Sequence, residues 1–350
     1  MRYKVFCMLA FSLLFMSCST SELKNEKLTI IYSGNIGGQL NPCGCKIPMG
    51  GYARKSTILK FLRGETGKNI LVLDSGGLLF NTNFLKPPTD SIYRHHAYVA
   101  TRIIEKLGFD AINVSSFDLS NSVDSLLAVD QASSIPWMSS NLVWKDSGEA
   151  IFKTGTVLSK GNLKIGLFGV MADDFLGAPL YDDSSPMKVL DVVETVKKEV
   201  AALKDQTDII IALSYMSEKE TTAFCEAVSG IDVVIHSHNG YHNADVAPSL
   251  YTPMKIGKTL LLRCPDGGRV LGVSELEMVN GSAEFIEVEN RIKVSEGIDE
   301  SKEYAGEKDS KFTNTFYILN AEIRTDTEIQ DEIDSYEEGL QKLKEDVGIF

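Results

Sequence analysis

The stretch Asn41-Pro-Cys-Gly-Cys-Lys-Ile-Pro-Met-Gly-Gly-Tyr-Ala-Arg-Lys55 joins the first expected strand of the chain to its first expected helix. Residues 27–32 before it are β-branched and aromatic, and residues 52–62 carry apolar side chains at helical spacing. Strand, loop and helix in this order form the unit from which α/β proteins are built, and these proteins place their chemistry in the loops after the strands. The stretch therefore predicts an α/β fold with functional residues in this loop.

Cys43 and Cys45 are the most reactive residues of the stretch, and they flank Gly44. No side chain lies between them, so the backbone is free to bring both sulfurs to the same side. Such a pair can form a strained, labile disulfide or bind a soft transition metal. In the alternative, both cysteines are loop staples that pair with Cys225 and Cys264. Four cysteines allow three pairings, and the sequence leaves the connectivity open.

Arg54 is a candidate partner for a thiolate in this loop. Together with Lys46 and the expected helix N-terminus, its charge would lower the pKa of a nearby thiol. We therefore take Cys43 and Cys45 as redox candidates, with Arg54 beside them. The alternative for Arg54 and Lys55 is that both belong to a solvated helix start.

Downstream of this stretch, apolar runs typical of buried strands alternate with amphipathic helical patterns. The expected strands cover residues 69–75, 110–116, 136–142, 208–214 and 231–235, and the expected helices cover residues 96–107, 121–131, 189–203 and 217–228. Residues 259–263, 270–278 and 283–288 read as an antiparallel meander, with Gly-Gly and Asn-Gly at the turns. Alternation followed by a meander predicts an α/β sandwich of two sheets.

The chain of 350 residues, 43 % of them hydrophobic, can bury one large core. We place the corresponding domain at residues 27–294. Residues 295–327 are polar and charged and are expected to form a linker. Residues 328–350 carry an amphipathic pattern, so we expect them to close the chain as a helix that packs on the domain.

Residues 1–17 resemble a secretory signal, because a basic start precedes an apolar run that is too short to span a membrane. Residues 14–18, Leu-Phe-Met-Ser-Cys, are similar to a bacterial lipobox. Cys18 would then carry a lipid, residues 18–26 would form a tether, and the exported protein would be anchored to a membrane of the bacterial cell envelope. In the alternative, the signal is cleaved in the ordinary way and Cys18 is incidental.

The net charge narrows the range of partners. It is −13 for the whole chain, and loss of Arg2 and Lys4 with the signal lowers it to −15. So acidic a protein is not expected to bind nucleic acid. Disulfides persist in export compartments, so a thiol or disulfide partner protein is compatible with the cysteine pair.

The order of seven short motifs carries a resemblance to a known family. The motifs are Thr29-Ile-Ile-Tyr-Ser-Gly-Asn35, Gly50-Gly-Tyr-Ala-Arg54, Leu71-Val-Leu-Asp-Ser-Gly-Gly77, Leu107-Gly-Phe-Asp-Ala-Ile-Asn113, Ile210-Ile-Ala-Leu-Ser-Tyr215, Gly230-Ile-Asp-Val-Val-Ile235 and Gly267-Gly-Arg-Val-Leu-Gly272. In this order they resemble the exported 5′-nucleotidase family, whose catalytic domain has the calcineurin-like metallophosphatase fold. The resemblance implies a two-sheet βαβ sandwich with helices on the outer faces, here without the family's C-terminal nucleotide-binding domain.

The family resemblance implies hydrolysis of a phosphate ester by metal-activated water, with two divalent metals held by Asp, His and Asn ligands. At the matching positions this chain carries other residues. They are Asn35 and Gly37 after the first strand, Gly77 after the second, Val114 and Ser115 after the third, and Tyr215 at the end of a later strand. Two hard cations need several carboxylates nearby. We therefore expect a degenerate site from which the divalent metal pair is lost.

Four residues near these positions keep the character of metal ligands. Asp74 and Asp118 lie near the same strand ends, although capping of loops is their expected role. The family's Gly-His-x-His motif leaves a trace as His236-Ser-His238 or, with a shift of two residues, as His238-Asn-Gly240. His236 and His238 are candidate ligands for a soft transition metal together with the cysteine pair. The alternative is a pair of satisfied loop histidines.

The Cys-Gly-Cys loop would lie above the strand ends, where the family holds its metals. Here the chain resembles a subgroup that carries Cys-Gly-Cys, or a selenocysteine variant, before the Gly-Gly-x-Ala-Arg motif, which implies thiol redox chemistry. One thiolate would attack a disulfide or peroxide, and its neighbour would resolve the product. Two rivals stay open: a phosphoesterase of the 5′-nucleotidase type with an unorthodox metal site, and a non-catalytic binding protein of the envelope.

Overall fold

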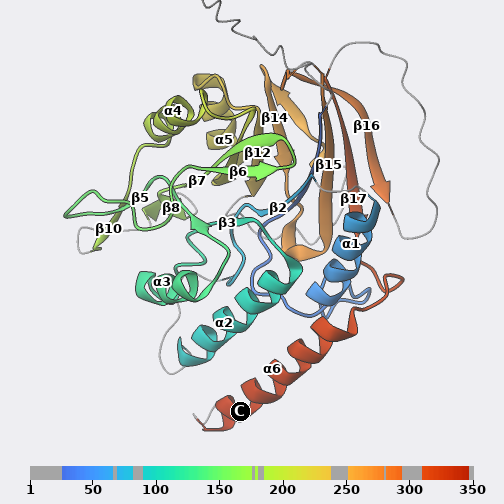
Figure 1. Cartoon of the computed structure of the whole chain (residues 1–350). Helices are drawn as coiled ribbons and strands as arrows, with labels where there is room; N and C mark the ends of the chain where they lie inside the picture. Colours follow the sequence, from blue (N-terminus) through green and yellow to red (C-terminus); the bar gives the residue numbers. More distant parts are fainter. Residues whose placement is uncertain are drawn as a thin grey trace, which may run out of the picture.

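The computed structural model describes residues 26–65, 69–81, 90–175, 178–179, 185–237, 251–279, 281–293 and 310–346. In this part of the chain two β-sheets pack face to face, and helices cover the outer side of each sheet (Figure 1). The α/β sandwich expected from the sequence is confirmed. The antiparallel meander expected over residues 259–288 is wrong, because its first strand belongs to one sheet and the other two, which are not neighbours, belong to the other sheet.

The first sheet has the strand order β16-β17-β15-β1-β2-β3-β4 within the described residues. Its strands are β1 (Glu26–Ser33), β2 (Ile70–Asp74), β3 (Ala111–Asn113), β4 (Trp137–Met138), β15 (Val270–Met278), β16 (Phe285–Lys293) and β17 (Ser310–Ile318). Strands β1 to β4 run parallel to one another, and β15 on the other side of β1 runs antiparallel to it. The parallel strands therefore end at one edge of the sheet, where the loops with the expected site residues lie.

The second sheet has the strand order β13-β14-β12-β11-β7-β6 within the described residues. Its strands are β6 (Thr156–Lys160), β7 (Leu163–Met171), β11 (Ile209–Tyr215), β12 (Val233–Ser237), β13 (Met254–Ile256) and β14 (Thr259–Arg263). Two short antiparallel pairs accompany the sheets: β5 (Leu142–Trp144) with β10 (Met187–Val189), and β8 (Asp174–Phe175) with β9 (Ala178–Pro179).

Six α-helices lie in the described ranges. They are α1 (Tyr52–Glu65), α2 (Asp90–Leu107), α3 (Val123–Ala132), α4 (Val192–Leu203), α5 (Glu218–Ala227) and α6 (Thr327–Asp346). Helices α1, α2, α3 and α6 share a core with the first sheet, and α4 and α5 share one with the second. Ser217 and Glu220 form a capping box at the start of α5, which sets where that helix begins.

Alternation along the strands divides the apolar residues among three layers. In β1, Ile30 and Tyr32 point into the core between the sheets, and Ile31 points toward the helices. In β11, Ile211 belongs to the core between the sheets and Ile210 to the layer under α4 and α5. Successive strand residues face opposite sides of a sheet, so strands buried on both faces must be apolar throughout.

The expected linker at residues 295–327 is corrected in part. Strand β17 occupies Ser310–Ile318, pairs with β15 and β16, and buries Phe312 and Phe316 in the core between the sheets. The polar residues that suggested a linker alternate with these aromatic residues, so the pattern has the period of a strand. Residues 294–309 lie outside the described part.

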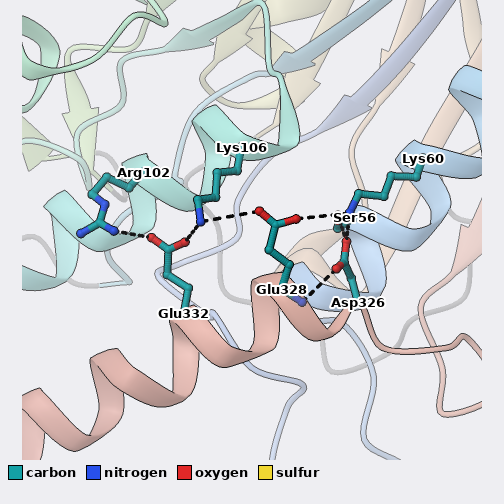
Figure 2. A network of polar contacts seen from close by, with 7 residues as sticks. All are labelled: Ser56, Lys60, Arg102, Lys106, Asp326, Glu328 and Glu332. Carbon is teal, nitrogen blue, oxygen red and sulfur yellow. Dashed lines mark hydrogen bonds and ion pairs between the residues drawn. The ribbon is translucent and has the colours of Figure 1, made fainter.

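Helix α6 packs across α1 and α2 and is fixed there by a network of polar contacts (Figure 2). Its apolar face contributes Ile329, Ile333 and Tyr336 to the core under the first sheet. At its start, Asp326 accepts a hydrogen bond from Ser56 (2.5 Å) and lies 2.6 Å from Lys60 Nζ. Helix α6, near the C-terminal end of the described chain, is therefore held against α1 and α2 from its N-terminal part.

No helix of the described residues is both long and apolar enough to cross a bilayer. The signal, the lipobox and Cys18 lie outside the described part, so lipid attachment stays a prediction.

Candidate functional site

The structure brings most of the expected ligand positions together at the ends of β1, β2 and β11. The backbone N–H of Asn35 donates to Gly76 O (2.7 Å), and that of Gly37 donates to Gly77 O (2.8 Å). The hydroxyl of Tyr215 donates to Asn35 Oδ1 at 3.5 Å. Asn35, Gly37, Gly77 and Tyr215 thus form one group, buried except for the half-buried Gly37. We call it, together with Asp74, Ser115 and Asp118, the strand-end cluster.

Tyr215 fills the space beside the glycines of this cluster. A Cβ atom added to Gly77 would lie 2.9 Å from Tyr215 Cε2 and 2.9 Å from Asn35 Oδ1. At Gly76 it would lie 2.9 Å from Tyr215 Cδ2. Both glycines also have positive φ, +111° for Gly76 and +71° for Gly77, which disfavours any side chain. A carboxylate at position 77 is therefore incompatible with the tyrosine.

Asp118 is buried and holds two loops of the cluster. It accepts hydrogen bonds from the backbone N–H groups of Gly77 (3.2 Å), Leu78 (3.0 Å) and Leu79 (2.8 Å), and from Ser115 Oγ (2.6 Å). Burial raises its pKa to about 6, although these hydrogen bonds favour the charged form. The carboxylate thus caps loops.

Asp74 lies at the end of β2 and is fully buried. It accepts hydrogen bonds from Ser33 Oγ (2.8 Å) and the backbone N–H of Gly76 (3.0 Å). Burial raises its pKa, and the charge of Lys55 opposes that rise. Loop capping, the role that the sequence favoured for both carboxylates, is what their contacts show.

Lys55 is 2 % exposed, so its assignment to a solvated helix start is wrong. Its Nζ lies 4.9 Å from the centre of the Tyr52 ring. Burial lowers the pKa of Lys55 to about 8, although the electrostatic interactions with Asp74 and Cys264 oppose that shift. Sequence reasoning missed this residue. The signal was its spacing, because a residue three positions after Tyr52 and four before Leu59 lies on the same helix face.

His236 is buried at the end of β12 and turns toward α5. Its Nδ1 lies 3.1 Å from Thr221 Oγ1, which in turn lies 2.8 Å from Ser214 Oγ. His238, the other candidate ligand, falls outside the described residues. Val114 is buried in the core under the helices, where it cannot serve a metal.

The described residues do not fit the family's pair of hard cations. No group of three or more His, Cys, Asp or Glu side chains in this part of the chain is placed to hold a metal. Asp74 and Asp118 are engaged with loops, and the tyrosine ring occupies the position beside Gly77. Loss of the metal pair nevertheless stays a prediction.

Cys43 and Cys45 lie in the loop before α1 as free thiols. Cys43 is 6 % exposed, and Cys45 is exposed. Cys225 and Cys264 are also free and buried, and Cys264 Sγ lies 3.2 Å from Ser75 Oγ in the strand-end cluster. The structure therefore contains none of the pairings that would make Cys43 and Cys45 structural staples.

The surroundings of Cys43 stabilise its thiolate. Burial alone would raise its pKa, but the pKa is lowered by a hydrogen bond from the Cys45 thiol, by the backbone N–H of Met49 (3.5 Å to Sγ) and by the charge of Arg269. The pKa of Cys45 is raised, chiefly because its thiol is hydrogen-bonded to Cys43. Arg269 Nη2 lies 3.9 Å from Cys45 Sγ. The pKa values of the two thiols are thus shifted in opposite directions, beside a guanidinium group.

Arg54 supports the loop and does not bond a sulfur directly. Its Nη1 donates to the carbonyl oxygens of Pro48 (2.8 Å) and Leu319 (3.3 Å), and its charge interacts with Cys43. The residue that does reach a sulfur, Arg269, was missed, although it stands in the Gly267-Gly-Arg269 segment already quoted for the fold. A basic residue directly after a Gly-Gly turn was the available signal.

A cavity of about 350 Å³ lies between the cysteine loop and the strand-end cluster. Ile36, Gly37, Gln39, Asn81, Asp266, Gly267 and Arg269 line it. Asn35 Nδ2 donates to Asp266 Oδ1 (2.8 Å), and Arg269 is the residue beside Cys45. The cavity therefore borders both parts of the candidate site.

No model of a known protein family matches the sequence. The chain is similar to a 5′-nucleotidase of Vibrio vulnificus, with 23 % identity over 350 residues that cover 90 % of this chain and 59 % of that protein. A 5′-nucleotidase of Vibrio cholerae is 26 % identical over 243 residues, 66 % of this chain and 38 % of that protein. The chain thus spans less than two thirds of the length of these relatives.

Solved structures share the fold. The 5′-nucleotidase precursor of Thermus thermophilus superposes with a TM-score of 0.69 over 91 % of this chain and 60 % of its own, at 16 % identity. The calcineurin-like phosphoesterase YfkN of Bacillus subtilis gives 0.64 over 91 % of this chain and 99 % of its own, at 16 % identity. The fold is that of the calcineurin-like metallophosphatases. Homologues of this chain include proteins named 5′-nucleotidase.

Proposed function

We propose that this chain is an exported thiol redox protein built on the metallophosphatase fold, with Cys43 and Cys45 as its reactive pair. The observation that carries the proposal is a pair of free thiols in one loop, Cys43 and the exposed Cys45, with Arg269 Nη2 3.9 Å from Cys45 Sγ and the pKa of Cys43 lowered. A thiolate is the nucleophile in disulfide exchange, and a neighbouring thiol can resolve the mixed disulfide. The occupied space beside Gly77 gives indirect support, since it removes room for the family's metal ligand.

The test is thiol trapping of the mature protein across a range of dithiol and disulfide potentials, read by mass spectrometry. We expect a Cys43–Cys45 disulfide that opens at a moderate potential, while Cys225 and Cys264 stay reduced because both are buried. Cys225→Ser is the matched control and should leave the transition unchanged. Stable pairing of Cys43 or Cys45 with Cys225 or Cys264 would sink the proposal.

The same pair is also proposed to bind a soft transition metal when reduced, because thiolates select such ions. Metal analysis of the reduced protein should then find up to one ion per chain. That ion should be lost in the Cys43→Ser and Cys45→Ser variants and retained in Cys225→Ser.

The second candidate function is a metal-dependent phosphoesterase with an unorthodox site, which the names of the homologues favour. It predicts release of phosphate from a nucleoside monophosphate in the presence of a divalent metal. Loss of that activity in Asp74→Asn but not in Cys43→Ser would favour it over the redox proposal. If neither activity is found, a non-catalytic binding protein of the envelope is the remaining candidate.

Export and lipid anchoring through Cys18 are part of the proposal. They predict that the mature N-terminus is a lipid-modified Cys18 and that the protein fractionates with membranes. Cys18→Ala should release it from the membrane fraction.

A further inference from the structure

The cavity beside the thiols has walls of mixed charge. Its lining includes one basic residue, Arg269, one acidic residue, Asp266, and two amides, Gln39 and Asn81. With about 350 Å³ it is at the small end of the range of ligand pockets, roughly 300 to 1,000 Å³. A cavity of this size suits a small polar molecule better than a polypeptide segment.

Two of the lining residues also contact the cysteine loop. Arg269 Nη2 lies 3.9 Å from Cys45 Sγ. In the amide orientation that satisfies both of its polar groups, Gln39 accepts a hydrogen bond from the Cys43 N–H (2.7 Å) and donates to Gly267 O (3.3 Å). A molecule bound to the guanidinium group of Arg269 would therefore lie near the exposed sulfur of Cys45.

The charged residues are fixed on either side of a tight turn. Asp266 belongs to the short 3-10 turn Asp266–Gly268, and Arg269 follows it directly. The side chain of Asn35 donates to Asp266 Oδ1, and the backbone N–H of Gly267 donates to Asn35 O (2.9 Å). Asp266 also has a hydrogen bond with Tyr251. A carboxylate accepts several hydrogen bonds at once, so its bonds with Asn35 and Tyr251 are compatible with an ammonium group on the same carboxylate.

A guanidinium group and a carboxylate that line one cavity have charges opposite to those of the carboxylate and ammonium groups of an α-amino acid. Resting on the redox function proposed above, we propose that the cavity binds a small zwitterionic disulfide, of the class of cystine, and presents it to Cys45. Arg269 would bind the substrate carboxylate, and Asp266 would bind its ammonium group.

The reaction balances without any further reagent. The exposed thiol of Cys45 passes its proton to the Cys43 thiolate and attacks one sulfur of the disulfide. A Cys45–substrate disulfide forms, and the other half leaves as a thiolate that takes this proton from Cys43. The thiolate of Cys43 then attacks Cys45 Sγ, a Cys43–Cys45 disulfide forms, and the second half leaves as a thiol. One disulfide is reduced to two thiols, and the two protein thiols are oxidised.

The first experiment measures thiol release by the pre-reduced full chain from four disulfide probes under single-turnover conditions. Cystine carries both charges, cystamine only the positive one, dithiodiglycolate only the negative one, and bis(hydroxyethyl) disulfide neither. We expect cystine to react about tenfold faster than each of the others, since only it can pair with both charged residues. The Cys43→Ser, Cys45→Ser double variant gives the background from other thiols.

The second experiment assigns the recognition to residues. Arg269→Gln should lower the ratio of the cystine rate to the bis(hydroxyethyl) disulfide rate by about fivefold or more, because the uncharged probe corrects for any change in thiol reactivity. Asp266→Asn should lower the same ratio. Arg324→Gln, which removes an exposed guanidinium group elsewhere, is the matched control and should leave it unchanged.

The third experiment identifies the attacking sulfur. Cys43→Ser should accumulate a mixed disulfide with one cysteine on Cys45, and Cys45→Ser should accumulate none. A mixed disulfide found on Cys43 instead would overturn the order of attack.

The outcomes separate the two proposals. Equal rates for all four disulfides would overturn the zwitterion pocket and leave the redox function standing. Failure of every disulfide to oxidise the pair would overturn the redox function itself, and the pocket proposal with it.

Discussion

Tyr215 and Gly77 form a matched pair, because the ring of one occupies the place of a side chain on the other. The backbone at Gly77 has φ of +71°, so a substitution there meets both strain and a clash. Tyr215 in turn is almost fully buried and contacts Phe117 edge to face. The two residues should therefore be energetically coupled.

The coupling predicts the outcome of a double-mutant cycle. Gly77→Ala should lower the free energy of unfolding by about 2–4 kcal/mol, from strain and the clash with the ring. In a Tyr215→Ala background the same change should cost at least about 1 kcal/mol less, since the ring is gone and the strain remains. Urea denaturation of the four proteins measures this. Equal costs in both backgrounds would show that the ring does not occupy the space.

The lowered pKa of Lys55 predicts that the free energy of unfolding changes at alkaline pH. Its pKa is lowered from an ordinary 10.5 to about 8. Between these values the unfolded chain binds more protons than the folded one, so this group makes stability rise with pH across the window. From pH 7 to pH 10 it should add about 2 kcal/mol to the free energy of unfolding.

The control for this prediction is Lys55→Met, which keeps the buried stem and removes the charge. The variant should lack the rise seen in the natural protein when both are unfolded by urea at the two pH values. An identical pH dependence in the two proteins would mean that the ammonium group is solvated.

At the scale of elements, α6 connects helices α1 and α2 through ion pairs. Glu332 Oε1 lies 2.7 Å from Arg102 Nη2, and its other oxygen pairs with Lys106 (Figure 2). Glu328 on the same helix lies 3.8 Å from both Lys60 and Lys106. The helix also reaches the cysteine loop, because Glu337 accepts a hydrogen bond from Asn41 (2.5 Å).

The two glutamates provide a matched comparison. The side chain of Glu332 is 11 % exposed and that of Glu328 is 65 % exposed. Glu332→Gln should lower the free energy of unfolding by about 1–2 kcal/mol, and Glu328→Gln by less than about 0.5 kcal/mol, because solvent screens the exposed pairs. Chemical denaturation at low and high salt measures both. Equal effects of the two substitutions would contradict the claim that the buried ion pairs of Glu332 stabilise the packing of α6 on α2.

At the scale of the whole molecule, His96 joins three segments that are distant in sequence. Its Nδ1 lies 2.9 Å from Tyr336 Oη of α6, and it has a backbone hydrogen bond with Gly38 near the strand-end cluster. Burial lowers its pKa from 6.5 to about 4. The unfolded chain therefore binds more protons between these pH values, and this group's contribution to stability falls as pH is lowered through the window.

The prediction is a loss of stability in mild acid that depends on this histidine. Between pH 7 and pH 4 the imidazole should account for about 2–3 kcal/mol of that loss. Asp118 and Asp232, whose pKa values are raised to about 6, act in the opposite direction, so the comparison must be made between variants. His96→Gln should show a smaller loss than the natural protein in thermal or urea unfolding across this range.

Much of the fold could be predicted from the sequence, because buried strands and amphipathic helices leave periodic patterns that depend on local residues. Strand β17 was missed since its polar residues dominate the composition while Phe312 and Phe316 mark its buried face. The site was predicted less well. Which side chains meet depends on loops that close between distant segments, so Arg269 could be placed beside Cys45 only in three dimensions.

The fit between Tyr215 and Gly77 also has a historical consequence. An ancestor with a carboxylate at position 77 would have had to give up that group before, or together with, accepting the tyrosine, because the two cannot coexist. Going back by a single substitution now passes through an overcrowded or a hollow intermediate, and most proteins lack the spare stability to survive either. The packing around Gly77 thus makes a carboxylate at position 77 hard to introduce by a single substitution.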